Sequence, residues 1–338
     1  MSAPMLSRAS LAAFTDAAAD ATVVPGYSRI GIALRRRLER WGSPPSMSGQ
    51  TVVVTGGTSG IGLAAATAMA GLGATVHLQG RDPARGEQAR AAVAAAGPAA
   101  VGLDLVEMSD PGAVAAFAAH ITESYECVNV LVHNAGALYP GYGATAAGVE
   151  RTVATQVLAP YLLTAHLAPV LWTSSPATVV TVSSGGMYTQ RFDLSRLEMD
   201  SASYEGPVAY ARCKRAQVVL AAAWARCFAP AGVASFSMHP GWADTPGLKA
   251  GLPRFEALLR PLLRTAAEGA DTVVWLAAGG PRREAAESGE PAPTTGFFHD
   301  RHRRREQRFP VRAPSSVGDG EALLEWCAAR TGLETPRP

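Results

Sequence analysis

The sequence predicts a doubly wound α/β fold, in which helices cover both faces of a mostly parallel sheet. Short β-branched runs alternate with longer helical patterns along the chain, which is typical of repeated βαβ units. A glycine-rich stretch separates the first of these strands from its helix. We expect about seven strands in the order 3-2-1-4-5-6-7, forming one domain over residues 49–300. Residues 1–48 and 301–338 are expected to be extensions of this domain.

The composition of the chain limits the kinds of function that the protein can have. The chain has 338 residues, of which 48% are hydrophobic, so it can bury a large core. Its 30 basic and 28 acidic residues give a net charge of +2, which offers no support for a nucleic-acid partner. The four cysteines form no Cys-x2-Cys pair, which suits a reducing cytoplasm. We expect no membrane-spanning helix, since we find no apolar run of about 18 residues.

The first strand and its glycine loop are predicted from QTVVVTGGTSGIG at residues 50–62. The valine run fits a buried parallel strand, and a helical pattern follows the glycines. We expect Gly56 to form a tight turn, Gly60 to let the backbone approach a pyrophosphate, and Gly62 to allow close packing of helix on strand. The other loop residues expected to contact a dinucleotide are Thr58, Ser59 and Ile61. An ordinary turn is the alternative for such a spacing.

The second strand, at residues 74–82, carries the signal for cofactor choice. Folds that bind NAD place an acid near the end of this strand, where it holds the ribose 2′-hydroxyl. Here Gly80 takes that place and Arg81 follows. A guanidinium can grip a 2′-phosphate with two hydrogen bonds, which favours NADP over NAD. The alternative is a solvated arginine at a helix start, and Asp82 before Pro83 is explained as the cap of that helix.

Polar residues follow the next two strands. Residues 99–105 form a strand that ends at Asp104 and Leu105, and Asp104 is a candidate acceptor for the adenine amino group, although a loop cap would explain it too. Residues 128–137 form a strand that runs into Asn134, Ala135 and Gly136, which we place beside the cofactor. The apolar helix at 149–171 should kink at Pro160.

The fifth strand and the helix after it supply the chemistry. Residues 177–187 bring Ser183 and Ser184 to the carboxyl end of a strand, where open α/β sheets bind ligands. Tyr210 and Lys214 share one helix face, so the ammonium can favour the phenolate. Only two of the 30 basic residues are lysines, which makes a chance match at this spacing improbable.

Residues 232–247 in the last third of the domain predict a sixth strand that ends in His239, Pro240, Gly241 and Trp242, with Thr245 close behind. A final edge strand is expected at 294–301, and the basic run at 301–305 is interpreted as a solvated face. His299 and His302 have a spacing that a metal could use, but without a carboxylate and histidine cluster around them we expect no metal site.

A basic amphipathic helix is predicted at residues 29–41. Its apolar side chains recur at helical spacing (Ile30, Leu34, Leu38 and Trp41), and arginines fill the other faces (Arg35, Arg36, Arg37 and Arg40). Such a helix can pack on its own domain or on a neighbouring subunit. The alternative is contact with an anionic membrane surface.

Taken together, these motifs resemble the short-chain dehydrogenase/reductases, which have a Rossmann-type fold. The resemblance covers about residues 50–300 and rests on the glycine loop, Asn134-Ala135-Gly136, Ser184, Tyr210 with Lys214, and Pro240-Gly241 with Thr245. The segments VTVSSGGM, MHPGWADTPG and GFFHDR are most similar to the member 12 group of that family.

The resemblance implies roles for the site residues. Tyr210 would be the general acid/base, Lys214 would lower its pKa and bind the nicotinamide ribose, and Ser184 would hold the substrate oxygen. Thr245 and the Pro240-Gly241 turn would contact the carboxamide. The family usually has an asparagine that feeds a water relay to the lysine, whereas this chain has Gln156, which leaves the relay open.

We therefore expect an NAD(P)(H)-dependent oxidoreductase that interconverts a carbonyl and an alcohol. The substrate is expected to be a lipophilic small molecule, because apolar residues follow both site segments (Met187, Tyr188, Leu248, Leu252 and Phe255). The alternative is a cofactor-binding regulatory protein with little turnover, which Gln156 favours. We expect a cytoplasmic protein, with membrane contact through residues 29–41 as a further hypothesis.

Overall fold

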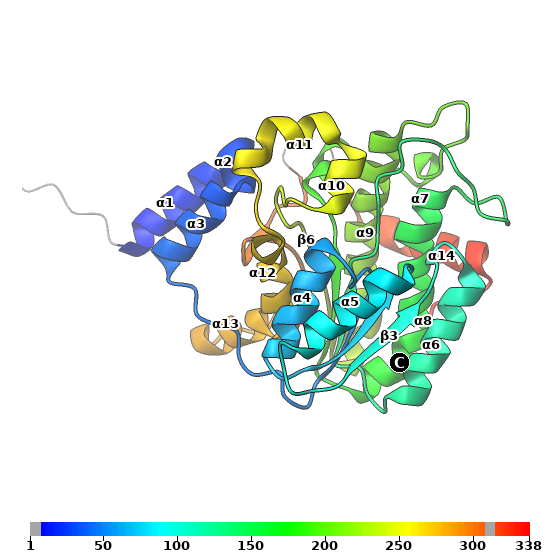
Figure 1. Ribbon diagram of the computed structural model, residues 1–338, viewed down its shortest axis with the longest axis horizontal. Coiled ribbons are helices and arrows are strands. Elements are labelled where there is room, and N and C mark those ends of the chain that lie inside the picture. Colours follow the sequence, from blue (N-terminus) through cyan, green and yellow to red (C-terminus); the bar gives the residue numbers. More distant parts are fainter. Residues whose placement is uncertain (1–7, 308–314) are drawn as a thin grey trace, which may run out of the picture.

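The computed structural model describes residues 8–307 and 315–338, which form one sheet with helices on both faces (Figure 1). The strand order is β3-β2-β1-β4-β5-β6-β7-β8, so the predicted order is confirmed and one strand is added. All neighbouring strands are parallel except β7 and β8. The strands are β1 (Thr51–Val54), β2 (Thr75–Gly80), β3 (Val101–Leu105), β4 (Val130–His133), β5 (Ala177–Val182), β6 (Val233–Met238), β7 (Thr295–His299) and β8 (His302–Arg304).

Two hydrophobic cores lie on opposite faces of the sheet. On one face pack α4 (Gly60–Gly71), α5 (Pro83–Ala94) and α12 (Ala266–Ala277), with α13 (Gly280–Ser288) after them. On the other face pack α6 (Pro111–Ser124), α8 (Ala159–Thr173) and α9 (Gly206–Phe228), with α14 (Val317–Thr331) against α9. Strands β1, β4, β5 and β6 are buried along their whole length, as expected for central strands of a parallel sheet.

The prediction that Asp82 caps a helix is confirmed. Its carboxylate accepts a hydrogen bond from the Arg85 main-chain N–H at 2.9 Å, and Pro83 opens α5. Asp82 is therefore committed to the helix start and does not replace the missing acid at the end of β2.

The basic run at residues 301–305 was wrongly interpreted as a solvated face. Residues His302–Arg304 form the antiparallel edge strand β8, and Asp300 and Arg301 make the turn with φ values of 52° and 61°. Arg304 is only 9% exposed because its guanidinium bonds to Asp16, 2.7 Å from Nη1 to Oδ2. A partner distant in sequence therefore makes a charged strand possible here.

The long apolar helix is interrupted near Pro160. The segment α7 (Arg151–Val153) leads into a π-helical turn at Ala154–Leu158, and α8 follows. The run Arg151–Thr173 is long and apolar enough to span a membrane by composition, contrary to our expectation, but 83% of its apolar window is buried inside the protein. It is the central core helix on its face of the sheet.

Three helices precede the sheet, where we predicted one. They are α1 (Arg8–Ala21), α2 (Val23–Tyr27) and α3 (Arg29–Glu39), and they pack on one another at one side of the molecule (Figure 1). Two residues of the predicted apolar stripe of α3 do not pack on the domain, because Ile30 is 52% exposed and Leu34 is 38% exposed. The buried face instead carries Gly31, Ile32 and Arg35.

The physical reason lies in the neighbours of that face. A Cβ on Gly31 would lie 2.6 Å from the carbonyl oxygen of Pro25, so only glycine lets α3 lie this close to α2. Arg35 points inward because it pairs with the carboxylates of Asp16 and Asp300. Two short helices, α10 (Pro246–Gly251) and α11 (Pro253–Leu259), lie at the end of the molecule to which the parallel strands point (Figure 1).

Candidate active site

The glycine loop after β1 forms a cradle that fits a pyrophosphate. Gly56 has a φ of 63°, and a Cβ there would lie 2.9 Å from the Cα of Ala135. A Cβ on Gly62 would lie 2.3 Å from the carbonyl oxygen of Gly56, so the loop closes tightly onto α4. Ser59 is the N-cap of α4, and its side chain makes no capping hydrogen bond. The N–H groups of the first helical turn can therefore serve an anion.

Asn134 holds this loop in place. Its side-chain amide donates to the carbonyl oxygens of Thr55 and Gly56, both at 3.0 Å. The main-chain N–H groups of Asn134 and Ala135 both donate to the Thr55 hydroxyl, at 3.0 and 3.1 Å. Asn134 thus joins the end of β4 to the glycine loop. A Cβ on Gly136 would lie 2.9 Å from Oε1 of Gln156, so the segment after β4 also closes onto the π turn.

Arg81 lies at the end of β2 and is open to solvent. Its side chain is 65% exposed, and its Nη1 lies 3.6 Å from Oε2 of Glu107. A Cβ on Gly80 would lie 2.4 Å from Cγ2 of Thr58, so an acidic side chain at position 80 would require Thr58 to move. Gly80 and Arg81 thus stand where NAD-binding folds place an acid, and Arg81 offers a guanidinium instead.

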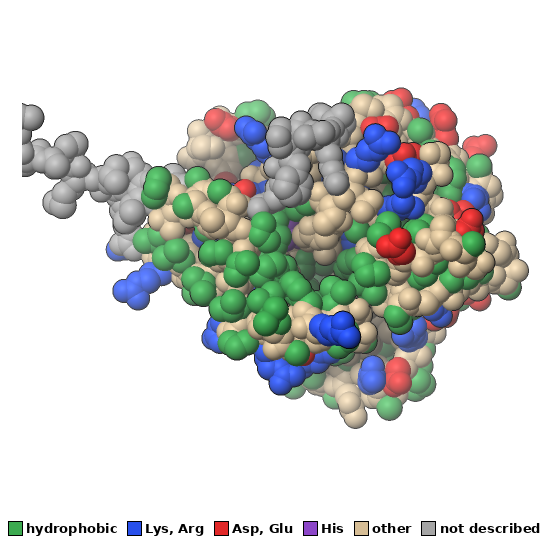
Figure 2. All heavy atoms as spheres, turned by 90° about the horizontal axis from the view of Figure 1, so that it is seen from above, with side chains coloured by type: hydrophobic (Ala, Val, Ile, Leu, Met, Phe, Trp, Pro, Cys, Tyr) green, Lys and Arg blue, Asp and Glu red, His purple; other side chains and the backbone are tan. Residues whose placement is uncertain are grey.

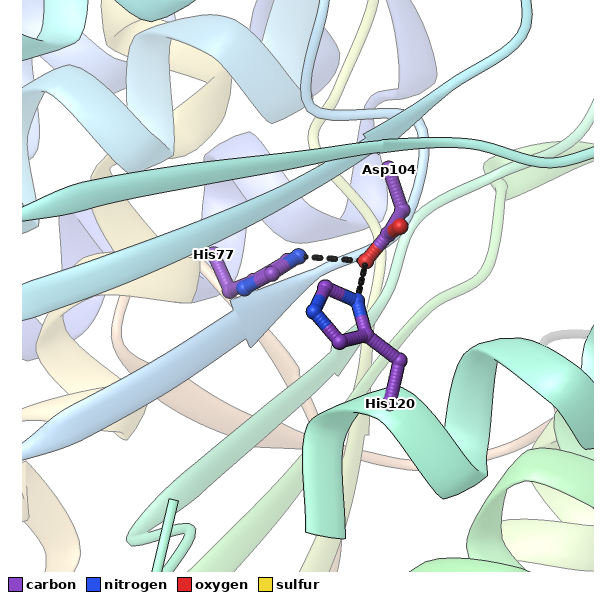
Figure 3. A group of neighbouring side chains, drawn as sticks. All are labelled: His77, Asp104 and His120. Atoms are coloured by element: carbon purple, nitrogen blue, oxygen red, sulfur yellow. Dashed lines mark hydrogen bonds and ion pairs between the residues drawn. The ribbon is translucent and has the colours of Figure 1, made fainter. Parts of the chain in front are cut away.

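Asp104 points toward two histidines (Figure 3). Its Oδ2 bonds to Nε2 of His77 at 2.8 Å and to Nδ1 of His120 at 2.7 Å. Burial lowers the pKa of His77 while the bond to Asp104 raises it, and the net pKa lies below its usual value. A hydrogen bond from adenine would have to use Oδ1, and the exposed Leu105 ends the strand beside it.

The same three side chains are a possible metal-ligand set that our sequence analysis overlooked. Among the described residues, the ligand atoms of His77, Asp104 and His120 lie within 4.8 Å of one another. The Tyr125 hydroxyl lies 3.1 Å from Nδ1 of His77 and can donate to it. Two N–H groups and one hydroxyl then satisfy the cluster as a hydrogen-bond network, so its geometry requires no ion.

Tyr210 and Ser184 meet where β5 ends and α9 begins. Burial raises the pKa of Tyr210 above its usual value of 10.0, and the hydrogen bond with Ser184 lowers it in part. Ser184 is partly exposed, whereas Ser183 is buried and donates to the main-chain oxygen of Lys214 at 2.7 Å. Ser183 thus ties β5 to α9, which leaves Ser184 as the serine that can meet a substrate.

Lys214 lies beneath Tyr210 and is 3% exposed. Its Nζ lies 5.5 Å from the centre of the Tyr210 ring, and burial lowers the pKa of Lys214 to about 8. The ammonium donates to the carbonyl oxygen of Val182 at 2.8 Å and to Oε1 of Gln217 at 3.0 Å. An ammonium has three donors, so one is left without a described protein partner and can serve the cofactor ribose.

Gln217 is the site residue that our sequence analysis missed. Its Nε2 donates to the main-chain oxygen of Gln156 at 2.8 Å, so it connects Lys214 to the π turn. The side chain of Gln156 donates to the Ala137 carbonyl oxygen at 2.9 Å, and its Oε1 is buried without a described partner. A glutamine three residues after the lysine, inside an apolar helix face, was the available signal.

The segment after β6 covers the glycine loop. Thr245 caps α10, with 3.2 Å between its hydroxyl and the Leu248 main-chain N–H. A Cβ on Gly60 would lie 3.3 Å from Cγ2 of Thr245, so this segment lies directly over the loop. Gly241 has a φ of 73°, and the Pro240 carbonyl oxygen accepts a hydrogen bond from Arg264 at 3.2 Å.

Tyr27 connects the N-terminal helices to both parts of the site, a contact that our sequence analysis did not foresee. Its carbonyl oxygen accepts a hydrogen bond from the Trp242 N–H at 2.8 Å, and its ring centre lies 4.5 Å from that of His239. A Cβ on Gly185, the residue after Ser184, would lie 2.7 Å from Cε2 of Tyr27. We call α1, α2 and α3 together the N-terminal clasp.

The clasp is held by buried ion pairs around Asp300. One carboxylate oxygen lies 2.5 Å from Arg35 and the other 2.5 Å from Arg264, and all three side chains are 1% exposed. Burial alone would raise the pKa of Asp300, but Arg264 and Arg35 outweigh it, and the pKa lies below its usual value. Arg35 also bonds to Asp16 at 2.7 Å.

Two of the expected pocket residues lie elsewhere. Met187 is fully buried and Tyr188 is 7% exposed, and both belong to a small core with Tyr27, Val218 and Phe297. The Tyr188 hydroxyl donates to the Arg305 carbonyl oxygen at 3.0 Å, which fixes the ring toward β8. Leu248, Leu252 and Phe255 lie on the α10 and α11 segment, where they remain candidates for a substrate contact.

The chain was compared with known proteins. Residues 50–252 match the short chain dehydrogenase family. Dehydrogenase/reductase SDR family member 12 of Bos taurus is 38% identical over 278 residues, which cover 82% of this chain and 84% of the relative. Retinol dehydrogenase 11 of Mus musculus is 30% identical over 239 residues, covering 68% of this chain and 74% of the relative.

A solved structure of an uncharacterised protein from Mycobacterium paratuberculosis has a similar fold. It superposes with a TM-score of 0.67 at 25% identity and covers 88% of this chain and 99% of that one. The matched region contains the glycine loop, Asn134, Ser184, Tyr210 and Lys214. The chain belongs to the short-chain dehydrogenase/reductase family, whose members are NAD(P)-dependent oxidoreductases.

Proposed function

We propose that the protein is an NADPH-dependent reductase of a lipophilic ketone or aldehyde, with Tyr210 as the general acid. The observation that carries the proposal is the position of Tyr210 between Ser184 and the buried Lys214. Ser184 follows β5, and the Lys214 ammonium reaches from α9 to the carbonyl oxygen of Val182 at the carboxyl end of that strand. This arrangement supplies a proton donor and a positive charge where a carbonyl oxygen would become an alkoxide.

Tyr210 is suited to be the acid of the reductive direction. Its ordinary pKa of 10.0 already keeps it protonated at neutral pH, burial raises that pKa further, and the hydroxyl can donate its proton to the substrate oxygen. Ser184 would hold that oxygen by a hydrogen bond, and the Lys214 ammonium would stabilise the phenolate that remains. When bound, the nicotinamide supplies the hydride for the carbonyl carbon.

NADP is proposed over NAD because of the residues around Arg81. The guanidinium is exposed, and its nearest acid is Glu107 at 3.6 Å, which a 2′-phosphate could displace. Thr58 fills the space that an acid at position 80 would need. The glycine loop, Asn134 and the turn at Pro240 and Gly241 would hold the rest of the cofactor.

The lipophilic character of the substrate is proposed from α10 and α11. Leu252 is 36% exposed at the start of α11, and Phe255 lies with its ring centre 5.2 Å from that of Trp242. One relative is named a retinol dehydrogenase, and retinol is an apolar alcohol. A substrate carbonyl flanked by apolar groups would suit these contacts.

A second candidate is a cofactor-binding regulatory protein with little turnover. It is favoured by the fact that Lys214 already donates two hydrogen bonds to protein groups, one of them to Gln217. Such a protein would bind NADPH without reducing any carbonyl.

The test is Tyr210→Phe, which keeps the ring and removes the proton donor. Positioned acids contribute about 10²–10⁴-fold, so NADPH-dependent turnover should fall by at least that factor while NADPH affinity stays unchanged. Turnover is measured by NADPH consumption over ketones, aldehydes, retinoids and steroids. Full activity in the variant would refute the mechanism, and an inactive wild type with tight NADPH binding would favour the second candidate.

We also propose that the exposed face of the clasp contacts anionic membrane. Ile30, Leu34, Val23 and Val24 are all exposed, and Figure 2 shows hydrophobic side chains gathered over this part of the molecule with basic side chains at the edge. Arg29, Arg36 and Arg37 are exposed on the same helix and would add electrostatic attraction.

A further inference from the structure

Gln217 lies beside the Lys214 ammonium inside the protein. Both side chains are buried, at 1% and 3% exposure, and they lie on one face of α9 at positions i and i+3. The amide oxygen of Gln217 accepts from the ammonium at 3.0 Å, and its NH₂ donates to the Gln156 main-chain oxygen at 2.8 Å. The opposite orientation would place the amide NH₂ against the Lys214 ammonium, and both groups are donors. The hydrogen-bonding partners therefore fix the amide orientation.

The sequence explains why the Gln156 carbonyl oxygen can accept this bond. In a regular helix it would accept from the N–H of the residue four positions later, but that residue is Pro160, which has no N–H. The local backbone is a π turn over Ala154–Leu158, which is wider than an α-helix and places the carbonyl beside α9. Pro160 and Gln217 are therefore complementary, since the first releases the acceptor that the second uses.

A carboxamide differs from water in what it can do with a proton. It accepts through its oxygen and donates through its nitrogen, so it can connect Lys214 to Gln156 but cannot readily pass a proton between them. In each reduction Tyr210 loses one proton to the substrate oxygen and must regain one from solvent. Ser184, which hydrogen-bonds to Tyr210, is partly exposed, so a proton could reach Tyr210 past Ser184.

We propose that Gln217 is a positioning residue whose amide replaces the water relay behind Lys214, so that Tyr210 regains its proton from the substrate side. The inference rests on the proposed reductase function for its kinetic tests and on NADPH binding for its remaining test. Gln217 holds the ammonium beneath Tyr210 and closes the route through the π turn. Its effect on the reaction is exerted through Lys214.

The first experiment compares Gln217→Met with Gln217→Glu. Wild-type kcat/KM should fall as pH rises through about 8, where Lys214 loses its charge. Methionine removes an acceptor from the ammonium and should move this fall to lower pH, whereas glutamate adds a negative charge and should move it to higher pH. Each shift should be about one pH unit, the size expected for one hydrogen bond to a charged group.

Val218→Ala is the matched control, because Val218 is the next buried residue of α9 and belongs to a separate core. It should leave the pH profile in place, and thermal unfolding of all variants checks that they fold. Shifts in the same direction for methionine and glutamate, no shift in either, or an equal shift in the control would overturn the proposal.

The second experiment measures the proton route. Initial rates in mixtures of H₂O and D₂O should depend linearly on the deuterium fraction in the wild type, because one proton moves in the limiting step. Gln217→Ala opens a polar space for water beside Lys214 and should give a curved dependence. A curved dependence in the wild type would contradict the closed route.

The third measurement separates this inference from the proposed function. NADPH affinity, followed by fluorescence across pH, should show the same opposite shifts for methionine and glutamate, because the ammonium is expected to bind the ribose. If these shifts occur and no carbonyl is reduced, the proposed role of Gln217 is supported and the reductase proposal fails. If carbonyls are reduced but the pH dependence of neither NADPH affinity nor kcat/KM shifts, the proposed role of Gln217 is refuted.

Discussion

Arginines at the cofactor end of the sheet and in the N-terminal clasp differ in depth and in partners. Arg81 is 65% exposed and lies 3.6 Å from a half-exposed glutamate. Arg35 and Arg264 are each 1% exposed, and both lie 2.5 Å from the buried carboxylate of Asp300. The exposed Arg81 can exchange its glutamate partner for a ligand. The buried Arg35 and Arg264 cannot lose Asp300 without leaving a buried charge less well compensated.

This difference shows that the arginine content of a sequence says little about what each arginine does. Exposed ion pairs typically contribute up to about 1 kcal/mol, whereas removing one member of a buried pair costs about 3–5 kcal/mol. Arg81 should therefore matter for ligand binding, and Arg35 and Arg264 for stability.

The largest expected effect is that of Asp300→Asn, which leaves the buried Arg264 guanidinium without a carboxylate and Arg35 with Asp16 alone. The free energy of unfolding should fall by about 4 kcal/mol, measured by urea denaturation near neutral pH. The control is Glu87→Gln on α5, which removes an exposed pair with Arg90 and should cost less than about 1 kcal/mol. Equal losses in the two variants would remove the distinction between the regions.

The ion pairs of Asp300 also make the stability of the protein depend on pH. Because the pKa of Asp300 is lowered in the folded protein, its stabilisation is complete above the ordinary carboxyl pKa. It is lost as pH falls through the lower, folded-state pKa. The difference in stability between wild type and Asp300→Asn should therefore shrink on acidification.

A slightly smaller effect is expected for Tyr27→Ala, which tests whether the clasp acts on the site. Truncating a buried aromatic ring should cost about 3 kcal/mol of stability. Since the ring lies against Gly185 and His239, kcat/KM for the carbonyl should fall by more than NADPH affinity does. The control is Phe14→Ala, a clasp aromatic that is 70% exposed. If the folded fraction of Tyr27→Ala kept full kcat/KM, the clasp would have a purely structural role.

At the cofactor end, Arg81→Ala should weaken NADPH binding by about 1–3 kcal/mol, with little change for NADH or for stability. Glu107→Gln is the matched variant, because it removes the competing acid and should tighten NADPH binding by less than about 1 kcal/mol. Titration by fluorescence measures both. Equal wild-type affinity for NADPH and NADH would show that Arg81 does not select the cofactor.

The smallest effect concerns the exposed side of the clasp, where each basic residue near an anionic surface contributes roughly 1 kcal/mol. Ile30→Asp combined with Leu34→Asp should reduce co-sedimentation with anionic vesicles, because both side chains are exposed. Val317→Asp on α14, which is 55% exposed, is the control. Deleting residues 1–49 would be a poor test, since Tyr27 and Arg35 would be lost with the exposed face. Equal pelleting of all three proteins would refute membrane contact.

The parts of the protein that the sequence predicted depend on local patterns. The valine run, the glycine loop and the Asp82 cap each lie within a few residues, and the strand order follows from repeated βαβ units. Tyr210 and Lys214 share a helix turn, so their proximity was also predictable.

The parts that the sequence did not predict depend on distant partners. The apolar pattern of α3 could not show that Arg35 is its buried residue, because the partner of Arg35, Asp300, is 265 residues away. Likewise, His302–Arg304 could be recognised as a strand only with Asp16 in place. Gln217 bonds to a carbonyl 61 residues earlier, and no spacing rule connects a glutamine to such an acceptor.

The ion pairs of the clasp join residues that are synthesised at different times. A ribosome releases Asp16 and Arg35 long before Asp300 and Arg304, so these helices emerge before two of their ion-pair partners, although Asp16 and Arg35 can already pair with each other. Strands β1 to β6 can pair before the clasp is fully docked, because its ion pairs with Asp300 and Arg304 form only once those residues have been synthesised. Closing of the clasp then brings Tyr27 against Gly185 and the loop after β6. The ion pairs with Asp300 and Arg304 therefore belong to a segment that is translated early, and they can form only after β7 and β8 have been synthesised.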